Sequence, residues 1–239
     1  NIIVPEFIEG YPFVKPVIDD SLVLWLDGST GNNYEQTGIW KDLSGNGNHG
    51  QLMNFGYIEN SGWVDGGLRF DGVDDYVRVP NVLNMDGDFT VEIWAESDVY
   101  NTARALFNTN ALASSPWNDK GFYITNIYNP QYLYCYINDG INGYVNLAIT
   151  NVSTFNNSHI VVKREGNMMY SFFNYTRQNS LNISSYKSFK TDNDITIARG
   201  YKGKVKVVRI YDRALSNEEI LQNYRAGQCS PLLAMRGDV

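Results

Sequence analysis

The chain has 239 residues, 43% of them hydrophobic and 14% aromatic, so it carries enough apolar side chains for a packed core, and disorder of the whole chain is excluded. Its 19 basic and 26 acidic residues give a net charge of −7, and no cluster of Lys and Arg interleaved with aromatics offsets it, which argues against nucleic-acid binding. No apolar run approaches the roughly 18 residues that cross a bilayer, so no membrane insertion is expected.

The first twenty residues predict an extended arm. Pro5, Pro12 and Pro16 lie among scattered aromatics, a composition that disfavours a helix or a central strand over residues 1–20. A first strand follows in SLVLWLDG, residues 21–28, and from there to about Asp212 short β-rich runs alternate with turns rich in Gly, Asn and Asp. This rhythm predicts an all-β fold, either a sandwich or a barrel.

Two runs show the alternation of a half-buried strand most clearly. In FTVEIWAE one face would hold Phe89, Val91, Ile93 and Ala95, and the other Thr90, Glu92, Trp94 and Glu96. In QYLYCYI the apolar residues Leu133, Cys135 and Ile137 alternate with Tyr132, Tyr134 and Tyr136, which predicts a strand with a tyrosine face. Further strands are expected at residues 121–127, 145–150, 159–164, 168–174, 195–198 and 205–211.

One helix is predicted, over residues 217–224. Ser216 and Glu219 form a capping box, Ile220, Leu221 and Tyr224 give one apolar side, and Gly227 is expected to end the helix. Residues 228–239 then form a second arm. Cys135 lies in a strand and Cys229 in this arm. They could form one disulfide or remain two unpaired thiols, but two cysteines are too few for a disulfide framework to hold the fold together.

Three separated phrases identify a family resemblance. WKDLSGNGNHGQL (40–52) and LRFDGVDDYVRVP (68–80) are short strands that end in tight turns, and VKVVRIYDRALSNEEILQNYRAG (205–227) joins the last strand to the helix. In this order they resemble the LamG-like jelly-roll domains of the concanavalin A-like lectin/glucanase superfamily. The resemblance implies an antiparallel β-sandwich over residues 21–227 that is closed by one short helix, with Trp25, Trp40 and Trp94 belonging to the fold.

The resemblance also raises calcium as a cofactor, because LamG-like domains often bind it. Ca²⁺ takes six to eight oxygen ligands, and turns at strand ends supply carboxylates and amides. The candidate ligands are Asp27, Asp42, Asn46, Asp71, Asp74 and Asp75. The alternative is that these side chains cap turns by accepting hydrogen bonds from backbone N–H groups.

Aromatic and amide side chains indicate a carbohydrate-binding surface. Aromatic rings stack on the apolar faces of sugars, while amides bond their hydroxyl groups, and both kinds of side chain concentrate between residues 117 and 144. The candidates are Trp117, Asn118, Tyr128, Tyr132, Tyr134, Tyr136 and Tyr144. The alternative is ordinary packing, because Tyr has a high strand propensity and is often half-buried.

A hydrolase is the catalytic alternative. Glycoside hydrolases of this superfamily carry a Glu-Ile-Asp-x-Glu strand, and residues 92–96 of this chain read EIWAE. Glu92 and Glu96 match the two glutamates, but Trp94 replaces the supporting Asp, so we expect no enzymatic activity. The two histidines lie in no nucleophile motif, and no Cys/His spacing fits a zinc site.

The sequence therefore predicts a non-catalytic, lectin-like module. Its expected partners are a glycan or cell-surface polysaccharide and, through the two arms, neighbouring protein subunits. DRALSNEEILQNY (212–224) is similar to phrases in LamG-like modules of phage and other virion proteins, and the chain starts without Met, as a processed product or an excised piece would. We expect display on a virion or another extracellular assembly. The rival is a structural decoration protein without a ligand.

Overall fold

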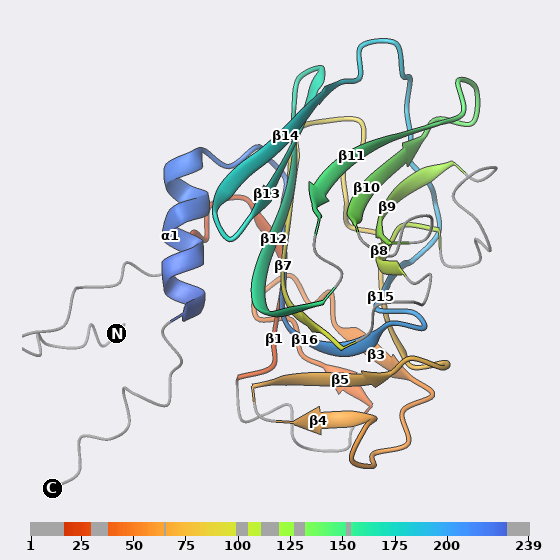
Figure 1. Cartoon of the computed structure of the whole chain (residues 1–239), viewed down its shortest axis with the longest axis vertical. Coiled ribbons are helices and arrows are strands. Elements are labelled where there is room, and N and C mark those ends of the chain that lie inside the picture. Colours follow the sequence, from red (N-terminus) through yellow and green to blue (C-terminus); the bar gives the residue numbers. More distant parts are fainter. Residues whose placement is uncertain are drawn as a thin grey trace, which may run out of the picture.

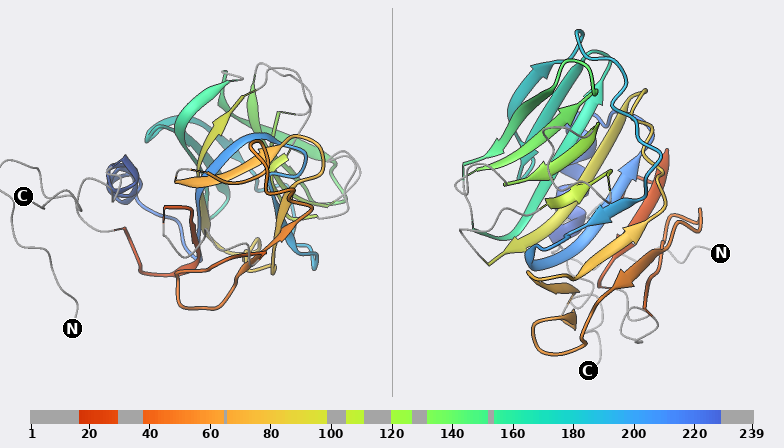
Figure 2. Two further views of the ribbon diagram at one scale, coloured as in Figure 1. Left: turned by 90° about the horizontal axis from the view of Figure 1, so that it is seen from below. Right: turned by 90° about the vertical axis from the view of Figure 1, so that its right-hand side faces the viewer.

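The computed structural model describes residues 17–29, 38–64, 66–98, 105–110, 120–126, 132–151 and 154–228. They form a sandwich of two sheets, with one helix outside it (Figures 1 and 2). Within these residues every strand pairing is antiparallel. The all-β sandwich with a short C-terminal helix, predicted from the sequence, is confirmed.

Sheet A has the strand order β14-β13-β12-β7-β16-β5-β4, and β1 also pairs with β16. Its strands are β1 (Leu22–Asp27), β4 (Gly62–Val64), β5 (Gly67–Asp71), β7 (Phe89–Ser97), β12 (Phe155–Glu165), β13 (Met168–Phe173), β14 (Thr176–Asn182) and β16 (Lys202–Tyr211). The long strand β7 lies at the centre of this sheet.

Sheet B has the order β11-β10-β9-β8-β15-β6-β3-β2. Its strands are β2 (Ile39–Trp40), β3 (Gly50–Met53), β6 (Tyr76–Val79), β8 (Ala105–Asn108), β9 (Gly121–Thr125), β10 (Leu133–Asn138), β11 (Tyr144–Thr150) and β15 (Ile195–Ile197). At the β11 edge the two sheets are joined, because Ser171 Oγ and Asn179 Nδ2 of sheet A donate to the Ala148 carbonyl at 2.7 and 3.0 Å.

The core lies between the sheets and follows the predicted alternation. Phe89, Val91, Ile93 and Ala95 of β7 are fully buried there, opposite Leu133, Cys135 and Ile137 of β10. The rings of Phe89 and Phe122 meet edge to face across the sandwich, with centroids 5.5 Å apart. Cys135 is a free thiol in this core, and burial raises its pKa, so it stays protonated; Cys229 lies outside the described residues.

Helix α1 (Asn217–Gln228) covers the outer face of sheet A (Figure 1). Its predicted capping box is confirmed, since the Ser216 N–H donates to Glu219 Oε2 at 2.8 Å and the Glu219 N–H donates to Ser216 Oγ at 3.2 Å. Ile220 packs with Leu215, Val161 and Phe172 in a second apolar cluster.

The expectation that Gly227 ends the helix is wrong, because α1 continues through it to Gln228. Gly227 lies against the indole of Trp94, and a Cβ atom at this position would come within 2.6 Å of the ring. Its lack of a side chain therefore lets the last turn of the helix approach the sheet, which is a packing role rather than a terminating one.

Candidate functional site

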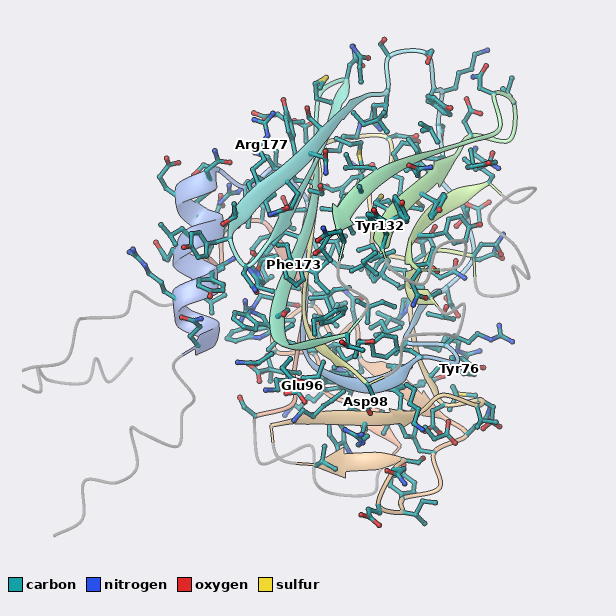
Figure 3. The ribbon with its side chains drawn as sticks, in the orientation of Figure 1. Tyr76, Glu96, Asp98, Tyr132, Phe173 and Arg177 are labelled. Atoms are coloured by element: carbon teal, nitrogen blue, oxygen red, sulfur yellow. The ribbon has the colours of Figure 1, made fainter. Side chains whose placement is uncertain are left out.

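A stripe of tyrosine rings runs along the outer face of sheet B. Neighbouring ring centroids lie 5.6 Å apart for Tyr132 and Tyr134, 5.7 Å for Tyr134 and Tyr136, and 6.0 Å for Tyr136 and Tyr144. The alternation of β10 produces this arrangement, because its apolar residues enter the core and leave the tyrosines on the opposite face. We call these four residues the tyrosine stripe; Figure 3 labels its first member, Tyr132.

The stripe combines aromatic surface with polar neighbours. Tyr144 is 40% exposed, Tyr132 and Tyr134 are half-buried, and Tyr136 is buried. Tyr136 pairs in register with Tyr123 of β9 and with the exposed Asn146 of β11. Burial raises the pKa of Tyr134, with a smaller contribution from Tyr132, so its hydroxyl is protonated at neutral pH and can donate as well as accept.

The turn between β10 and β11 fixes one end of the stripe. Asp139 Oδ1 accepts hydrogen bonds from the backbone N–H groups of Ile141 and Asn142 at 2.9 and 2.7 Å, and Oδ2 accepts from Asn142 Nδ2 at 2.7 Å and from the Lys187 N–H at 3.0 Å. Burial raises the pKa of Asp139, but these donors outweigh it and hold the pKa well below 3.8. An ionised Asp139 therefore holds the turn that joins β10 to β11, whose pairing brings Tyr144 near Tyr136.

The structure brings four of the seven predicted carbohydrate-binding residues together, and these are the tyrosine stripe. Trp117, Asn118 and Tyr128 lie outside the described residues, so their part stays a prediction. Tyr123 and Asn146 share the face but are not among the candidates from sequence. The alternation of GFYIT (121–125), with Phe122 and Ile124 in the core, could have indicated Tyr123.

Three of the predicted calcium ligands form one cluster. Asp71 ends β5, Asp74 and Asp75 lie in the turn before β6, and each of the three offers a carboxylate oxygen within 4.8 Å of the others. Burial raises the pKa of Asp75, and the carboxylates of Asp71 and Asp74 act in the same direction. Its side chain still accepts hydrogen bonds, from Ser61 Oγ at 3.1 Å and from the Asp71 N–H at 3.0 Å.

The other three predicted ligands make hydrogen bonds within the protein, and their part in calcium binding stays a prediction. Asp42 accepts from the backbone N–H groups of Trp25, Ser44 and Asn48, each at 2.9 Å. Asn46 Nδ2 donates to the Leu22 carbonyl at 3.0 Å, and Asp27 Oδ1 accepts from the Ser29 N–H at 2.9 Å. The contacts of Asp27 and Asp42 match the alternative of turn capping, whereas Asn46 donates to a carbonyl of β1.

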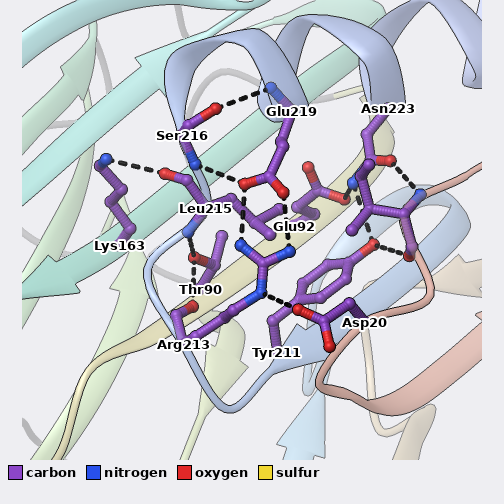
Figure 4. Close-up of polar contacts among 11 residues, drawn as sticks. Asp20, Thr90, Glu92, Lys163, Tyr211, Arg213, Leu215, Ser216, Glu219 and Asn223 are labelled. Carbon is purple, nitrogen blue, oxygen red and sulfur yellow. Dashed lines mark hydrogen bonds and ion pairs between the residues drawn. The ribbon is translucent and has the colours of Figure 1, made fainter.

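Glu92 lies in a fully buried polar network beneath α1 (Figure 4). Its Oε2 accepts from Asn223 Nδ2 of the helix at 2.9 Å and lies 3.4 Å from Arg209 Nη1, while its Oε1 lies 3.4 Å from His159 Nε2. Asn223 also donates to Tyr211 Oη at 2.9 Å and accepts from the Ile18 N–H at 2.9 Å. The network joins the helix, sheet A and the chain preceding β1.

Trp94 and Glu96 complete this face of β7. Trp94 is buried, as expected for a residue of the fold, and its ring stacks on those of His159 and Tyr224, with centroids 5.0 and 5.4 Å away. Glu96 pairs with Lys204 and Lys206 at 3.1 and 2.8 Å. Burial raises the pKa of Glu96, but these two lysines outweigh it and hold the pKa below 4.5.

Comparisons with known proteins agree with the fold. Residues 71–221 match a family model described as the concanavalin A-like lectin/glucanases superfamily. No curated protein sequence matches the chain. Within the described residues, no helix is long and apolar enough to span a membrane.

Among solved structures, the chain is similar to the binding domain of botulinum neurotoxin serotype D, with a TM-score of 0.65 and 16% identity over 87% of this chain and 52% of that one. It is also similar to the binding domain of botulinum neurotoxin DC in complex with SialylT (TM-score 0.62, 15% identity, 88% and 52% covered). The chain is similar as well to the same domain in complex with rat synaptotagmin II, with a TM-score of 0.61 and 16% identity over 88% of this chain and 52% of that one. The chain thus spans about half the length of these structures, and the likeness shows the fold.

Proposed function

Because the chain belongs to the concanavalin A-like lectin/glucanases superfamily, we propose that it is a non-catalytic carbohydrate-binding module. The tyrosine stripe supports the proposal, since its partly exposed rings, Tyr132, Tyr134 and Tyr144, offer surfaces on which the C–H faces of sugars can stack. The exposed amide of Asn146 and the tyrosine hydroxyls would bond sugar hydroxyls. A similar fold occurs in a neurotoxin binding domain in complex with SialylT.

The position of Glu92 supports leaving hydrolysis out of the proposal. A glycosidase needs two carboxyl groups that reach the glycosidic bond, about 5 to 5.5 Å apart for retention or about 6.5 to 9.5 Å for inversion. Glu92 is fully buried beneath α1, and Trp94 separates it from Glu96 on the strand. The test measures the release of reducing sugar from laminarin, agarose or carrageenan. If the protein releases sugar and the substitutions Glu92→Gln and Glu96→Gln abolish that release, the proposal that the module is non-catalytic is wrong.

Binding is tested by a glycan array followed by titration of the selected glycan. Tyr144→Ala removes the most exposed ring of the stripe, and we expect at least about tenfold weaker binding, the usual loss when an interface aromatic anchor is truncated. The matched control is Tyr175→Ala, which removes an exposed tyrosine that contacts Tyr224 of α1, beside sheet A. Equal weakening in both variants, or no binding on the array, would contradict the proposal.

The proposal includes a calcium ion at Asp71, Asp74 and Asp75. Two oxygens on one Ca²⁺, each about 2.3 to 2.6 Å from it, are separated by up to about 5 Å, which suits ligand atoms within 4.8 Å of one another. A divalent cation would also offset the repulsion among three carboxylates. Asp75 connects through Ser61 to a pocket of about 330 Å³ that Tyr57 and Trp63 help to line, so the ion would order this part of the surface.

We further propose that the module is displayed on a virion or another extracellular assembly through its arms. The contacts of Ile18 with Asn223 and Tyr211 support this, because they fix the end of the N-terminal arm against α1 and the sheet. Deleting residues 1–16 leaves these contacts in place. Lost incorporation into particles, with glycan binding retained, would support the arm's role. Lost incorporation in a protein that binds no glycan would favour the structural decoration protein instead.

A further inference from the structure

A pocket of about 240 Å³ lies on the outer face of sheet A, whereas the tyrosine stripe lies on sheet B. It is lined by Lys163, Glu165, Tyr170, Phe172, Arg177 and Asn217. The sheet register places these residues together, since Lys163 pairs with Tyr170 and Phe172 pairs with Arg177, while Asn217 is the first residue of α1. Figure 3 shows Arg177 near the helix, and Figure 4 shows Lys163 beside the helix start.

Two cations gather around one aromatic ring in this pocket. The Arg177 guanidinium lies 4.7 Å from the centroid of Tyr170, and Lys163 Nζ lies 5.4 Å from the same centroid. The ring quadrupole attracts both cations, but it does not neutralise them. The ring therefore positions two positive charges without cancelling either.

The two cations differ in their acidic neighbours, because Lys163 lies near the carboxylates of Glu165 and Glu219. Lys163 is buried and donates to the Leu215 carbonyl at 2.8 Å, and its Nζ forms an ion pair with Glu165 Oε2 at 3.2 Å. The Glu165 side chain is 58% exposed, so water and salt weaken its attraction. Among the described residues, no carboxylate pairs with Arg177, and its neighbours in the chain, Thr176 and Gln178, are uncharged.

An oxyanion is the ligand that completes these groups. The planar guanidinium offers a fork of N–H donors that matches a carboxylate, sulfate or phosphate group, and Lys163 adds a point charge. The side-chain amide of Asn217 adds a neutral donor at the rim. The volume lies below the roughly 300 to 1,000 Å³ of pockets for drug-sized ligands, so it suits one anionic group and the small moiety that carries it.

We propose that this pocket binds an oxyanion carried by a small ligand, at a site independent of the tyrosine stripe. The proposal does not rest on carbohydrate binding. The net charge of −7 favours a single anionic group over an extended polyanion, because the chain as a whole repels a long polyanion more strongly. An inorganic ion and the carboxylate of an acidic sugar share this chemistry.

The test measures binding of sodium sulfate, sodium phosphate, N-acetylneuraminic acid and glucuronic acid by NMR titration, with sodium chloride at equal ionic strength and glucose as references. We expect saturable binding of at least one of the four anions, weakened at least about tenfold in Arg177→Gln. Arg177→Lys, which keeps the charge but loses the fork, should bind with intermediate affinity. Arg225→Gln, at the opposite end of α1, is the matched control and should bind like the wild type.

Selectivity among the four anions identifies the source: binding of sulfate or phosphate alone indicates a free ion or its ester, and binding of the sugar acids alone indicates an acidic glycan. Both outcomes support the site if Arg177→Gln removes the binding. Binding no stronger than that of chloride, or equal affinity in Arg177→Gln and the wild type, overturns it. Circular dichroism of Arg177→Gln checks that the fold is retained, which we expect because Arg177 is exposed on the edge strand β14.

Discussion

Replacing the two glutamates of EIWAE one at a time should have very different effects on stability. Glu92→Gln removes the negative charge that faces Arg209 and His159 in a buried network, whereas Glu96→Gln removes one that faces two partly exposed lysines. The two substitutions change the same atoms on the same face of one strand. Their difference therefore isolates the effect of burial beneath α1.

The structure sets the expected magnitudes. Removing one partner of a buried ion pair costs about 3 to 5 kcal/mol, because the other charge is left uncompensated. The separations of Glu92 from Arg209 and His159 are both 3.4 Å, at the long end for such contacts, and the amide oxygen of the introduced glutamine could still accept from Asn223, so we expect about 3 kcal/mol. For Glu96→Gln we expect at most about 1 kcal/mol, as for other surface pairs.

Urea unfolding at neutral pH, followed by tryptophan fluorescence, measures both free energies by linear extrapolation. The dependence of the unfolding free energy on urea concentration should be the same in both variants as in the wild type. The loss of stability then appears as a lower urea concentration at the midpoint of unfolding. Equal costs for the two variants, or a cost below about 1 kcal/mol for Glu92→Gln, would refute the structural role that we assign to the network.

Three further predictions concern the helix, the hairpin and the metal site. Gly227→Ala should destabilise the protein by about 1 to 3 kcal/mol in urea unfolding, although Ala is normally the better helix residue, because its Cβ meets Trp94; a gain in stability would contradict the packing role. Asp139→Asn should lower stability at pH 7, because a carboxyl group with a lowered pKa stabilises the fold when ionised. Its deficit should shrink as the pH falls below about 4, and a deficit that is constant with pH would count against this. Calcium should raise the melting temperature and EGTA reverse it in the wild type and in Asp27→Asn, but not in Asp75→Asn; an equal response in all three would exclude the cluster.

Much of the architecture follows from local pattern. The alternation of FTVEIWAE and QYLYCYI places the correct residues in the core, and the capping box locates the start of α1, because each signal lies within a few residues of sequence. Strand β14 is not predicted, since its sequence TRQNSLN is polar and its residues are mostly exposed at a sheet edge. Its single apolar residue, Leu181, packs against the core but is too little to give a hydrophobic period.

The features that depend on distant partners could not be predicted. Glu92 meets Asn223, 131 residues away, and nothing local to β7 indicates that a helix covers its polar face. Gly227 resembles a helix stop because the contact with Trp94 is invisible in sequence. The tyrosines of β10 are recognised from alternation, but their continuation to Tyr144 depends on the β10–β11 register. The anion pocket likewise needs three strands and the helix to assemble.

The carbohydrate-binding claim is tested most directly by saturation-transfer and chemical-shift NMR on the complex with the glycan that the array selects. We predict that the protein signals that shift most belong to the tyrosine stripe and to Asn146, and that the sugar ring protons receive saturation from the stripe's aromatic rings. Shifts confined to residues of sheet A beside α1, with the stripe unchanged, would contradict it.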